Sequence, residues 1–221
     1  MLKSTVAALA SASFLALGAT AHAGDHKEAK VDAEKVAAQL AETAKGTYSV
    51  DKTHAFLFWK VSHFGLSTYT AKFTDWDATI DFDPANPAAS SVTASINPTA
   101  VQTDHPSQAE KWHGELANDF FKAEEFPAIT FKSTSVETTG PNTGKVTGDL
   151  TFLGVTKPIT LKVKYNGVGN VPWYGERDII GFDAKAKIKR SDFGLTRMID
   201  NGIGDEVTIV ISGEFLQDEA E

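Results

Sequence analysis

The sequence predicts an all-β protein, an antiparallel barrel or sandwich of roughly eight strands. From Thr47 to Phe215, apolar and polar residues alternate with a period of two in successive short runs. Turn signals such as DPANP, TTGPNTG, LGVTKP and DNGIGD separate these runs. Most connections are too short for a parallel crossover, so neighbouring strands are expected to be antiparallel. One uncharged face per strand indicates a shared apolar interior.

Residues 1–23 have the pattern of a secretory signal peptide. Lys3 precedes an apolar run that ends in the triplet Ala21-His22-Ala23, so we expect cleavage after Ala23 and a periplasmic location. The alternative is a buried N-terminal helix. The run is shorter and more polar than the ~20 apolar residues of a membrane span, so we expect no stable membrane insertion. The sequence has no Cys, which excludes a lipid-modified Cys and any disulfide.

The charge balance makes nucleic acid and anionic membrane surfaces poor partners. The formal net charge is −8, and Lys and Arg are scattered rather than gathered in a stripe. They alternate with apolar residues along the runs, as on a solvated outer face. An outer-membrane barrel would place these side chains against lipid, which is costly.

Residues 24–46 are expected to form an N-terminal extension with a helix at about 25–45, ended by Gly46. Its apolar stripe is mostly Ala, so the helix must dock on the domain or fray. The stripe comprises Ala29, Ala33, Val36, Ala37, Leu40, Ala41 and Ala44.

Residues 47–217 are expected to form the barrel domain. In its first strands, every second residue from Ala55 to His63 and from Trp76 to Phe82 is expected to face the interior. Ala71 and Phe73 lie at odd positions, so the register must slip near Thr74, and a bulge there would reset the face. Further strands are predicted around 92–96, 129–135, 146–152, 159–165, 180–188 and 207–215.

Residues at about 107–125 interrupt this pattern and suit one or two short helices, stopped by Pro127. The segment is too aromatic for a free surface. It either plugs one end of the barrel as packed core or forms the lid of a pocket.

Four segments resemble the YceI-like family: THAFLFWKVSHFGLSTYTAKFTDWDATIDFDPANPAASSVTASINPTAVQT, DFFKAEEFPAITFKSTSV, VTGDLTFLGVTKPITLKV and GFDAKAKIKRSDFGL. The resemblance runs from about Tyr48 to Phe215. It implies an extended, eight-stranded, lipocalin-like antiparallel barrel with an apolar tunnel for an isoprenoid or other long-chain amphiphile. It also implies a possible homodimer and no established enzymatic activity. The sequence departs from the family pattern in two places. Ala71 stands where the family often has Gly, and we expect it to narrow the tunnel slightly. The helix at 25–45 lies outside the family core.

Sequence patterning alone leaves two readings of the interior. Small and large residues can alternate to fill a tapering core, or they can leave room for a ligand. The resemblance favours the second reading, a bound long-chain lipid, and we expect no other cofactor. Gly148 has no side chain, so we expect a gap in the wall there, where an alkyl chain could lie. The expected ligand-binding residues are Leu57, Trp59, Val61, His63, Phe73, Trp76, Ile80, Phe82, Trp112, Leu116, Phe120, Phe121, Phe131, Gly148, Leu150, Phe152, Leu161, Phe182, Ile188, Phe193 and Ile209.

The histidines suggest neither a metal site nor a catalytic one. The spacing of His54, His63, His105 and His113 fits no usual zinc arrangement. His63 is expected to contact a ligand headgroup at the tunnel mouth or to bond to backbone, whereas a structural role is expected for His54. Arg190, in the family signature RSDFG, is expected to pair with a headgroup or a carboxylate.

The alternative function is a hydrolase or isomerase acting on a bound amphiphile. Ser62-His63 and Asp104-His105 are adjacent, but no nucleophile-elbow pattern surrounds them, so we expect no catalytic residues. Phe56 and Phe58 lie on the outer face of the first strand, where the N-terminal helix or a second subunit is expected to cover them.

Overall fold

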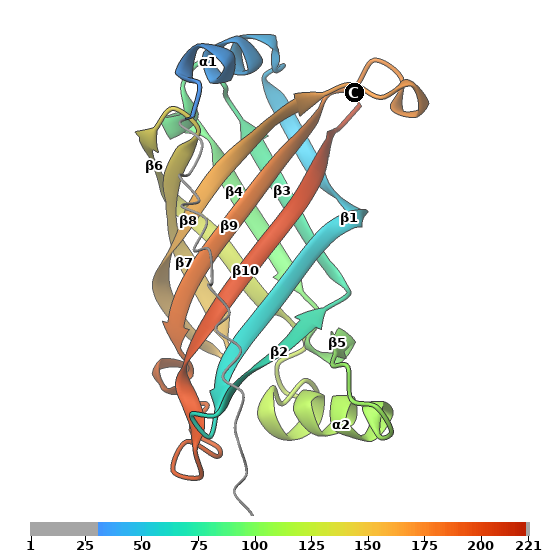
Figure 1. Ribbon diagram of the computed structural model, residues 1–221, viewed down its shortest axis with the longest axis vertical. Helices are drawn as coiled ribbons and strands as arrows, with labels where there is room; N and C mark the ends of the chain where they lie inside the picture. The colour runs from blue at the N-terminus through green and yellow to red at the C-terminus, as the bar shows by residue number, and fades with distance from the viewer. Residues whose placement is uncertain (1–30, 220–221) are drawn as a thin grey trace, which may run out of the picture. The chain divides into compact units, whose positions relative to one another are not determined.

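The protein is described by a computed structural model over residues 31–219, in which the strands wrap into one closed antiparallel barrel (Figure 1). The expected signal peptide, residues 1–23, and residues 25–30 of the expected helix lie outside the described residues. Eight strands form the ring in the order β1-β3-β4-β6-β7-β8-β9-β10, and β10 pairs with β1 to close it. They are β1 (Gly46–His63), β3 (Trp76–Phe82), β4 (Ser91–Ile96), β6 (Ile129–Gly140), β7 (Thr143–Phe152), β8 (Val155–Gly169), β9 (Ile179–Lys189) and β10 (Ile203–Gln217). The barrel prediction is confirmed, and the sandwich is excluded.

Two short strands, β2 (Ser67–Phe73) and β5 (Val101–Gln102), extend β3 and β4 along the barrel. β2 and β3 both pair with β1 and are separated by a kink at Thr74 and Asp75. Thr74 N donates to Ala100 O at 3.0 Å across this kink. Phe73, which precedes the kink, and Trp76, which follows it, are both buried. The register slip expected near Thr74 is therefore confirmed, as a two-residue kink.

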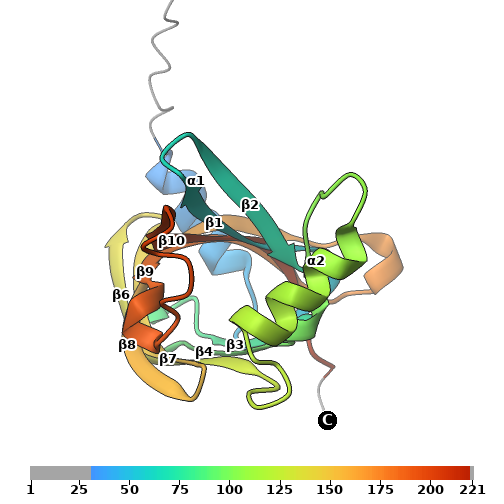
Figure 2. The same ribbon diagram turned by 90° about the horizontal axis from the view of Figure 1, so that it is seen from below.

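A helical insert lies between β5 and β6 and crosses one end of the barrel (Figure 2). It consists of α2 (Ala109–Glu115) followed by a π-helical turn, η3 (Leu116–Phe120). Leu116 and Phe121 are buried in the core, which confirms the helices predicted at about 107–125. Short 3-10 turns complete the fold: η1 (Pro87–Ala89), η2 (Pro98–Ala100), η4 (Pro172–Tyr174) and η5 (Arg190–Phe193).

The N-terminal helix α1 (Ala33–Glu42) docks against β8 at the other end of the barrel. Asp32 caps it by accepting hydrogen bonds from the N–H groups of Glu34 and Lys35, both at 3.1 Å. The helix ends at Glu42, because Thr43 takes an extended backbone and starts the path into β1. The expectation that Gly46 ends the helix was wrong, since Gly46 is already the first residue of β1.

The contact face of α1 is narrower than the predicted alanine stripe. Val36 is buried and Leu40 is half-buried, whereas Ala33, Ala37 and Ala41 are exposed. The Oγ1 of Thr43 lies 2.8 Å from the hydroxyl of Tyr165 on β8. A narrow apolar row and this buried hydrogen bond therefore fix the helix, and the alanines face solvent.

The β7–β8 hairpin shows how the sequence sets the strand register. Phe152 pairs with Val155 around a two-residue loop, in which Leu153 and Gly154 have φ of 51° and 72°. Two positive φ angles are typical of a type I′ turn, whose twist matches that of the strands. The ring of Phe126 also lies against Gly154, where a Cβ would come within 2.7 Å of its Cε1.

In the part of the chain described here, none of the helices combines the length and apolar character needed to cross a bilayer.

Candidate functional site: an apolar cavity inside the barrel

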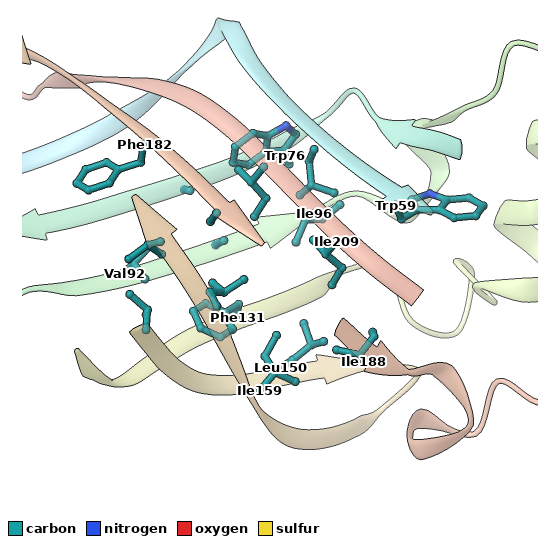
Figure 3. A pocket seen from close by; sticks show the side chains of 18 of the residues that line it. Trp59, Trp76, Val92, Ile96, Phe131, Leu150, Ile159, Phe182, Ile188 and Ile209 are labelled. Atoms are coloured by element: carbon teal, nitrogen blue, oxygen red, sulfur yellow. The ribbon is translucent and has the colours of Figure 1, made fainter. Parts of the chain in front are cut away.

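The barrel encloses a cavity of about 430 Å³ that is lined by side chains of all eight ring strands (Figure 3). The volume is about three times that of the ~150 Å³ engineered cavity that binds benzene. It also falls within the usual range for small-molecule sites, roughly 300–1,000 Å³. The interior is therefore a ligand-sized space rather than a filled core.

The middle of the cavity is aliphatic. Ala78 and Ala94 are directly paired on β3 and β4, and their small side chains leave the space open there. Ile159 of β8 and Ile209 of β10 also line the cavity (Figure 3).

Aromatic rings gather toward both ends. Phe182 contacts Phe82 at a centroid distance of 5.7 Å and Tyr165 at 5.5 Å, toward the α1 end. Phe121 contacts Trp59 at 6.1 Å and Phe73 at 5.5 Å, toward the α2 end. Aromatic rings therefore line the cavity on both sides of its aliphatic middle.

Most residues expected to bind a ligand line this cavity. They are Leu57, Trp59, Val61, His63, Phe73, Trp76, Ile80, Phe82, Trp112, Leu116, Phe120, Phe121, Phe131, Leu150, Phe152, Leu161, Phe182, Ile188 and Ile209. The period-two pattern therefore placed the inward faces correctly in space.

Gly148 and Phe193 do not line the cavity. A Cβ at position 148 would lie 2.7 Å from Phe131 Cε2 and closer still to Cζ, so the ring of Phe131 fills the expected gap. Phe193 is buried against Phe152, with ring centroids 5.9 Å apart. The expectation of a gap at Gly148 was wrong because its strand neighbour covers it.

Other lining residues were not among those expected. Many lie on the same inward faces and were therefore accessible to the pattern: Tyr69, Val92, Ala94, Ile96, Val146, Ile159, Val163, Tyr165, Ala184, Val207, Ile211 and Phe215. A second group comes from α1 and from loops, which strand periodicity does not address: Leu40, Pro87, Ser90, Pro141, Asn142 and Leu195.

The cavity opens at the α1 end. The exposed residues in its lining include Ser91, Thr138, Pro141 and Thr143, which belong to the start of β4 and to the β6–β7 hairpin. Leu40 of α1 borders the same region. This opening is the mouth of the cavity, and it collects most of the polar lining.

The α2 end is plugged. Leu116 and Phe121 are buried in the core, and Trp112 Nε1 donates to the hydroxyl of Tyr69 at 2.9 Å. The helical insert therefore acts as packed core, which is the first of its two expected roles.

The histidines have separate environments. His63 lies at the α2 end, so the expectation of a histidine at the mouth was wrong. Its ring packs edge-on against Phe64 at 4.5 Å, and among the hydrogen bonds between described residues none involves that ring. His105 Nδ1 accepts from Gln108 N at 3.1 Å, and His113 Nε2 accepts from Thr103 N at 2.9 Å, so both hold backbone.

Arg190 bonds to backbone rather than to a carboxylate. Its side chain is 4% exposed and donates to the carbonyl oxygens of Gly204, Leu195, Arg197 and Ile203 at 2.8, 3.2, 2.6 and 3.0 Å. Burial lowers the pKa of the guanidinium, while the charge of Asp205 opposes that effect. The expected pairing with a carboxylate was wrong, because four carbonyls occupy the guanidinium. Arg190 is among the residues that line the cavity, and its contact with a headgroup stays a prediction.

Asp51, His54 and Glu214 form a cluster on the outer face, where the β1–β10 register shifts between Val50 and Ala55. Their nitrogen and oxygen atoms all lie within 4.8 Å of one another, a proximity that the sequence spacing of the histidines did not indicate. Asp51 Oδ2 bonds to His54 Nδ1 at 2.8 Å and accepts from Tyr174 Oη at 2.9 Å. The hydrogen bond to Asp51 raises the pKa of His54. The hydrogen bond from Tyr174 attaches this irregular part of β1 to the β8–β9 loop. The bond of His54 to Asp51 belongs to the same cluster, which agrees with the structural role expected of His54.

A closed antiparallel barrel with an apolar cavity, one plugged end and one open end defines the class of lipocalin-like ligand-binding barrels. The chain belongs to the YceI-like domain family, whose model matches residues 48–215.

Similar proteins cover most of the barrel. A UPF0312 protein of Pseudomonas fluorescens (strain SBW25) is 42% identical over 150 residues, 67% of this chain and 76% of that protein. Protein YceI of Escherichia coli O157:H7 is 41% identical over 172 residues, 77% of this chain and 86% of that protein. A polyisoprenoid binding domain from Saccharophagus degradans, 16% identical, shares the fold with a TM-score of 0.59 over 77% of this chain and 98% of that domain.

Proposed function

We propose that this protein is a carrier that holds one long-chain amphiphile, such as an isoprenoid lipid, in the barrel cavity. The observation that carries the proposal is the apolar space of about 430 Å³ running along the barrel axis. Burial of a lipid chain there contributes ~0.8 kcal/mol per CH₂ before the costs of association are subtracted. Because such burial selects for length and shape, the proposal specifies a chain class rather than one compound.

The family and the fold support this choice. The Saccharophagus domain of the same fold is described as polyisoprenoid binding, which is the ligand class that the resemblance implied. The alternative enzyme would need a nucleophile or acid beside His63. In the described part of the chain the ring of His63 instead packs against Phe64 and Tyr69. We therefore infer binding without catalysis, and no cofactor beyond the bound lipid.

We further propose that the chain is exported to the periplasm after cleavage following Ala23. The N-terminal pattern supports this, with Lys3 before the apolar run and a small residue at each end of the triplet. The mass of the mature protein isolated from its native host tests it: a chain beginning at Gly24 is expected, whereas an intact Met1 at full length would overturn export by this route.

A homodimer is also consistent with the outer surface of β1. Phe56 and Phe58 stack at 6.0 Å, and Phe56 remains 50% exposed. The helix α1 packs against β8, so the expectation that this helix covers the pair was wrong. Of the two expected partners for these rings, a second subunit remains the proposal, and sedimentation of the wild type against Phe56→Ser tests it.

A substitution that fills the cavity tests the carrier function. Ala94→Phe places a ring in the middle of the cavity, and Ser95→Phe places the same ring on the exposed outer face of β4. Uptake of a C20 isoprenoid alcohol, measured by native mass spectrometry, is expected for the wild type and Ser95→Phe and to be lost in Ala94→Phe. Equal uptake by a folded Ala94→Phe variant would place the ligand outside the cavity.

A further inference from the structure

A single aromatic ring crosses the interior of the barrel near its plugged end. It belongs to Phe121, the residue that follows η3. On one side the ring contacts Trp59 of β1, with centroids 6.1 Å apart, and on the other it contacts Phe152 of β7, at 6.0 Å. Three strands separate β1 from β7 in one direction (β3, β4 and β6) and three in the other (β8, β9 and β10). The two walls are therefore opposite each other, and Phe121 spans the space between them.

The backbone of the helical insert holds this ring in place. The N–H of Phe121 donates to the carbonyl oxygen of Leu116 at 2.9 Å, the bond that closes the π-helical turn. Ala123 N donates to the carbonyl oxygen of Ala117 at 2.9 Å. Leu116, Ala117 and Ala123 are all buried, so Phe121 projects from a packed base.

Two other aromatic side chains of the insert have different partners. The ring of Phe120 lies against the guanidinium of Arg197, whose Cζ is 5.1 Å from the ring centroid. Trp112 Nε1 donates to the hydroxyl of Tyr69 at 2.9 Å. Phe121 is the aromatic residue of the insert whose ring contacts reach both walls.

The lining of the cavity continues past this ring toward the α2 end. Trp59, which the ring contacts, is followed along β1 by Val61 and His63, and Tyr69 of β2 pairs with Val61. Val61, His63 and Tyr69 all line the cavity. Phe121 thus stands between the aliphatic middle of the cavity and a short space at the plugged end.

The cavity has room for a chain of limited length. An engineered cavity of ~150 Å³ holds one benzene molecule. The barrel cavity, at about 430 Å³, is nearly three times as large, and by that comparison it holds on the order of 20 carbon atoms. A longer chain must either displace Phe121 or leave part of its length outside the mouth.

We propose that Phe121 limits the length of the bound chain, so that the barrel prefers isoprenoid alcohols of about C20 to longer ones. This inference rests on the proposed function and adds the chain length of the ligand. The mouth accepts the chain, the aliphatic middle buries it, and the ring of Phe121 stops its far end.

The test offers the delipidated mature protein an equimolar mixture of C15, C20, C25 and C30 isoprenoid alcohols in the same detergent micelles. Native mass spectrometry then gives the proportion of each bound chain. A chain that protrudes from the barrel loses the apolar contacts it had in the micelle, and about two exposed CH₂ groups cost about tenfold in affinity. The wild type is therefore expected to select C20 over C30 by about tenfold or more.

Phe121→Ala removes about as many carbon atoms as one isoprene unit contains and joins the space at the plugged end to the rest of the cavity. The ratio of bound C25 to bound C20 is expected to rise about tenfold in this variant. Phe126→Ala is the matched control. It removes the same ring from the same connection, but Phe126 lies against Gly154 and outside the lining, so the wild-type selection is expected to persist.

Equal binding of C20 and C30 by the wild type would overturn the inference and leave the carrier function intact. A folded Phe121→Ala variant that keeps the wild-type selection would also overturn it, because another side chain would then stop the chain. Binding of none of the four alcohols by the wild type would instead overturn the proposed function. If Phe121→Ala does not fold, Phe121→Leu replaces it, and a shift toward C25 is again expected.

Discussion

The ring of Phe131 on β6 lies directly over the Cα of Gly148 on β7, so that no space for a Cβ remains between the two strands. This contact closes the wall of the barrel at Gly148, which therefore does not line the cavity. Phe131 also lines the cavity, so the position of its ring determines the shape of the space available to a ligand.

Gly148→Ala is expected to lower the free energy of unfolding by about 1–3 kcal/mol, because its Cβ would collide with the Phe131 ring and would lie 2.5 Å from the carbonyl oxygen of Lys132. Urea denaturation measures the change. Gly169→Ala is the control, because a Cβ there meets nothing within 4 Å and its effect is expected to stay within about 0.5 kcal/mol. A fully stable Gly148→Ala variant would mean that Phe131 does not cover this glycine in solution.

Arg190→Lys is expected to destabilise the fold by about 2–4 kcal/mol, although the charge is retained. An ammonium cannot serve the four carbonyls that the guanidinium binds, and those carbonyls belong to the segment after η5 (Leu195 and Arg197) and to the start of β10 (Ile203 and Gly204). The midpoint of urea unfolding gives the readout. Arg177→Lys, at a half-buried site with a long contact of 3.7 Å to Glu219, should be near neutral, and equal effects of the two substitutions would contradict the account.

The hydrogen bond between Thr43 and Tyr165 is expected to attach α1 to the barrel. Tyr165→Phe and Thr43→Val should each lower stability by about 1 kcal/mol, and the double variant should lose little more than either single one. Thermal unfolding of the four proteins measures the coupling. Strict additivity would show that the two groups act independently and that α1 is held by Val36 and Leu40 alone.

The stabilisation contributed by His54 is expected to fall as the pH rises. Its hydrogen bond to Asp51 raises its pKa above the ordinary 6.5. A group with a raised pKa in the folded state contributes fully below its unfolded pKa and loses that contribution as the pH rises through the folded value. Asp51 itself changes only in strong acid: burial raises its pKa, but hydrogen bonds from Thr53, His54 and Tyr174 outweigh that and lower it.

The stability difference between the wild type and His54→Gln is therefore expected to be largest below pH 6.5 and to shrink toward pH 9. Chemical denaturation across this range measures it. A difference that stays constant, or that grows with pH, would show that the protonated imidazole does not stabilise this irregularity of β1.

The sequence predicted the inward faces well, because period-two alternation is a direct consequence of strand geometry. Trp59, Phe152 and Ile209 all line the cavity as expected, and the slip near Thr74 is present as a kink. Pairing of β10 with β1 was implied by the family resemblance, whereas alternation by itself fitted a sandwich equally well.

The remaining features depend on contacts that no local pattern records. The space beside Gly148 is filled by a side chain from the neighbouring strand, and Arg190 binds carbonyls from the β9–β10 connection and the start of β10 rather than a carboxylate. The mouth includes α1 and the β6–β7 hairpin, which are far apart in sequence. The helical stripe predicted that Leu40 packs on the domain but not that it borders the cavity, and Asn142 carried no signal of its own.

The central claim is that the barrel carries a long-chain lipid, and native mass spectrometry of the protein purified from its own host, followed by lipid extraction, tests it most directly. One long-chain amphiphile per barrel is expected for the wild type, and none for the Ala94→Phe variant. A wild-type barrel that is recovered empty, and that also takes up no long-chain lipid when one is supplied, would contradict it.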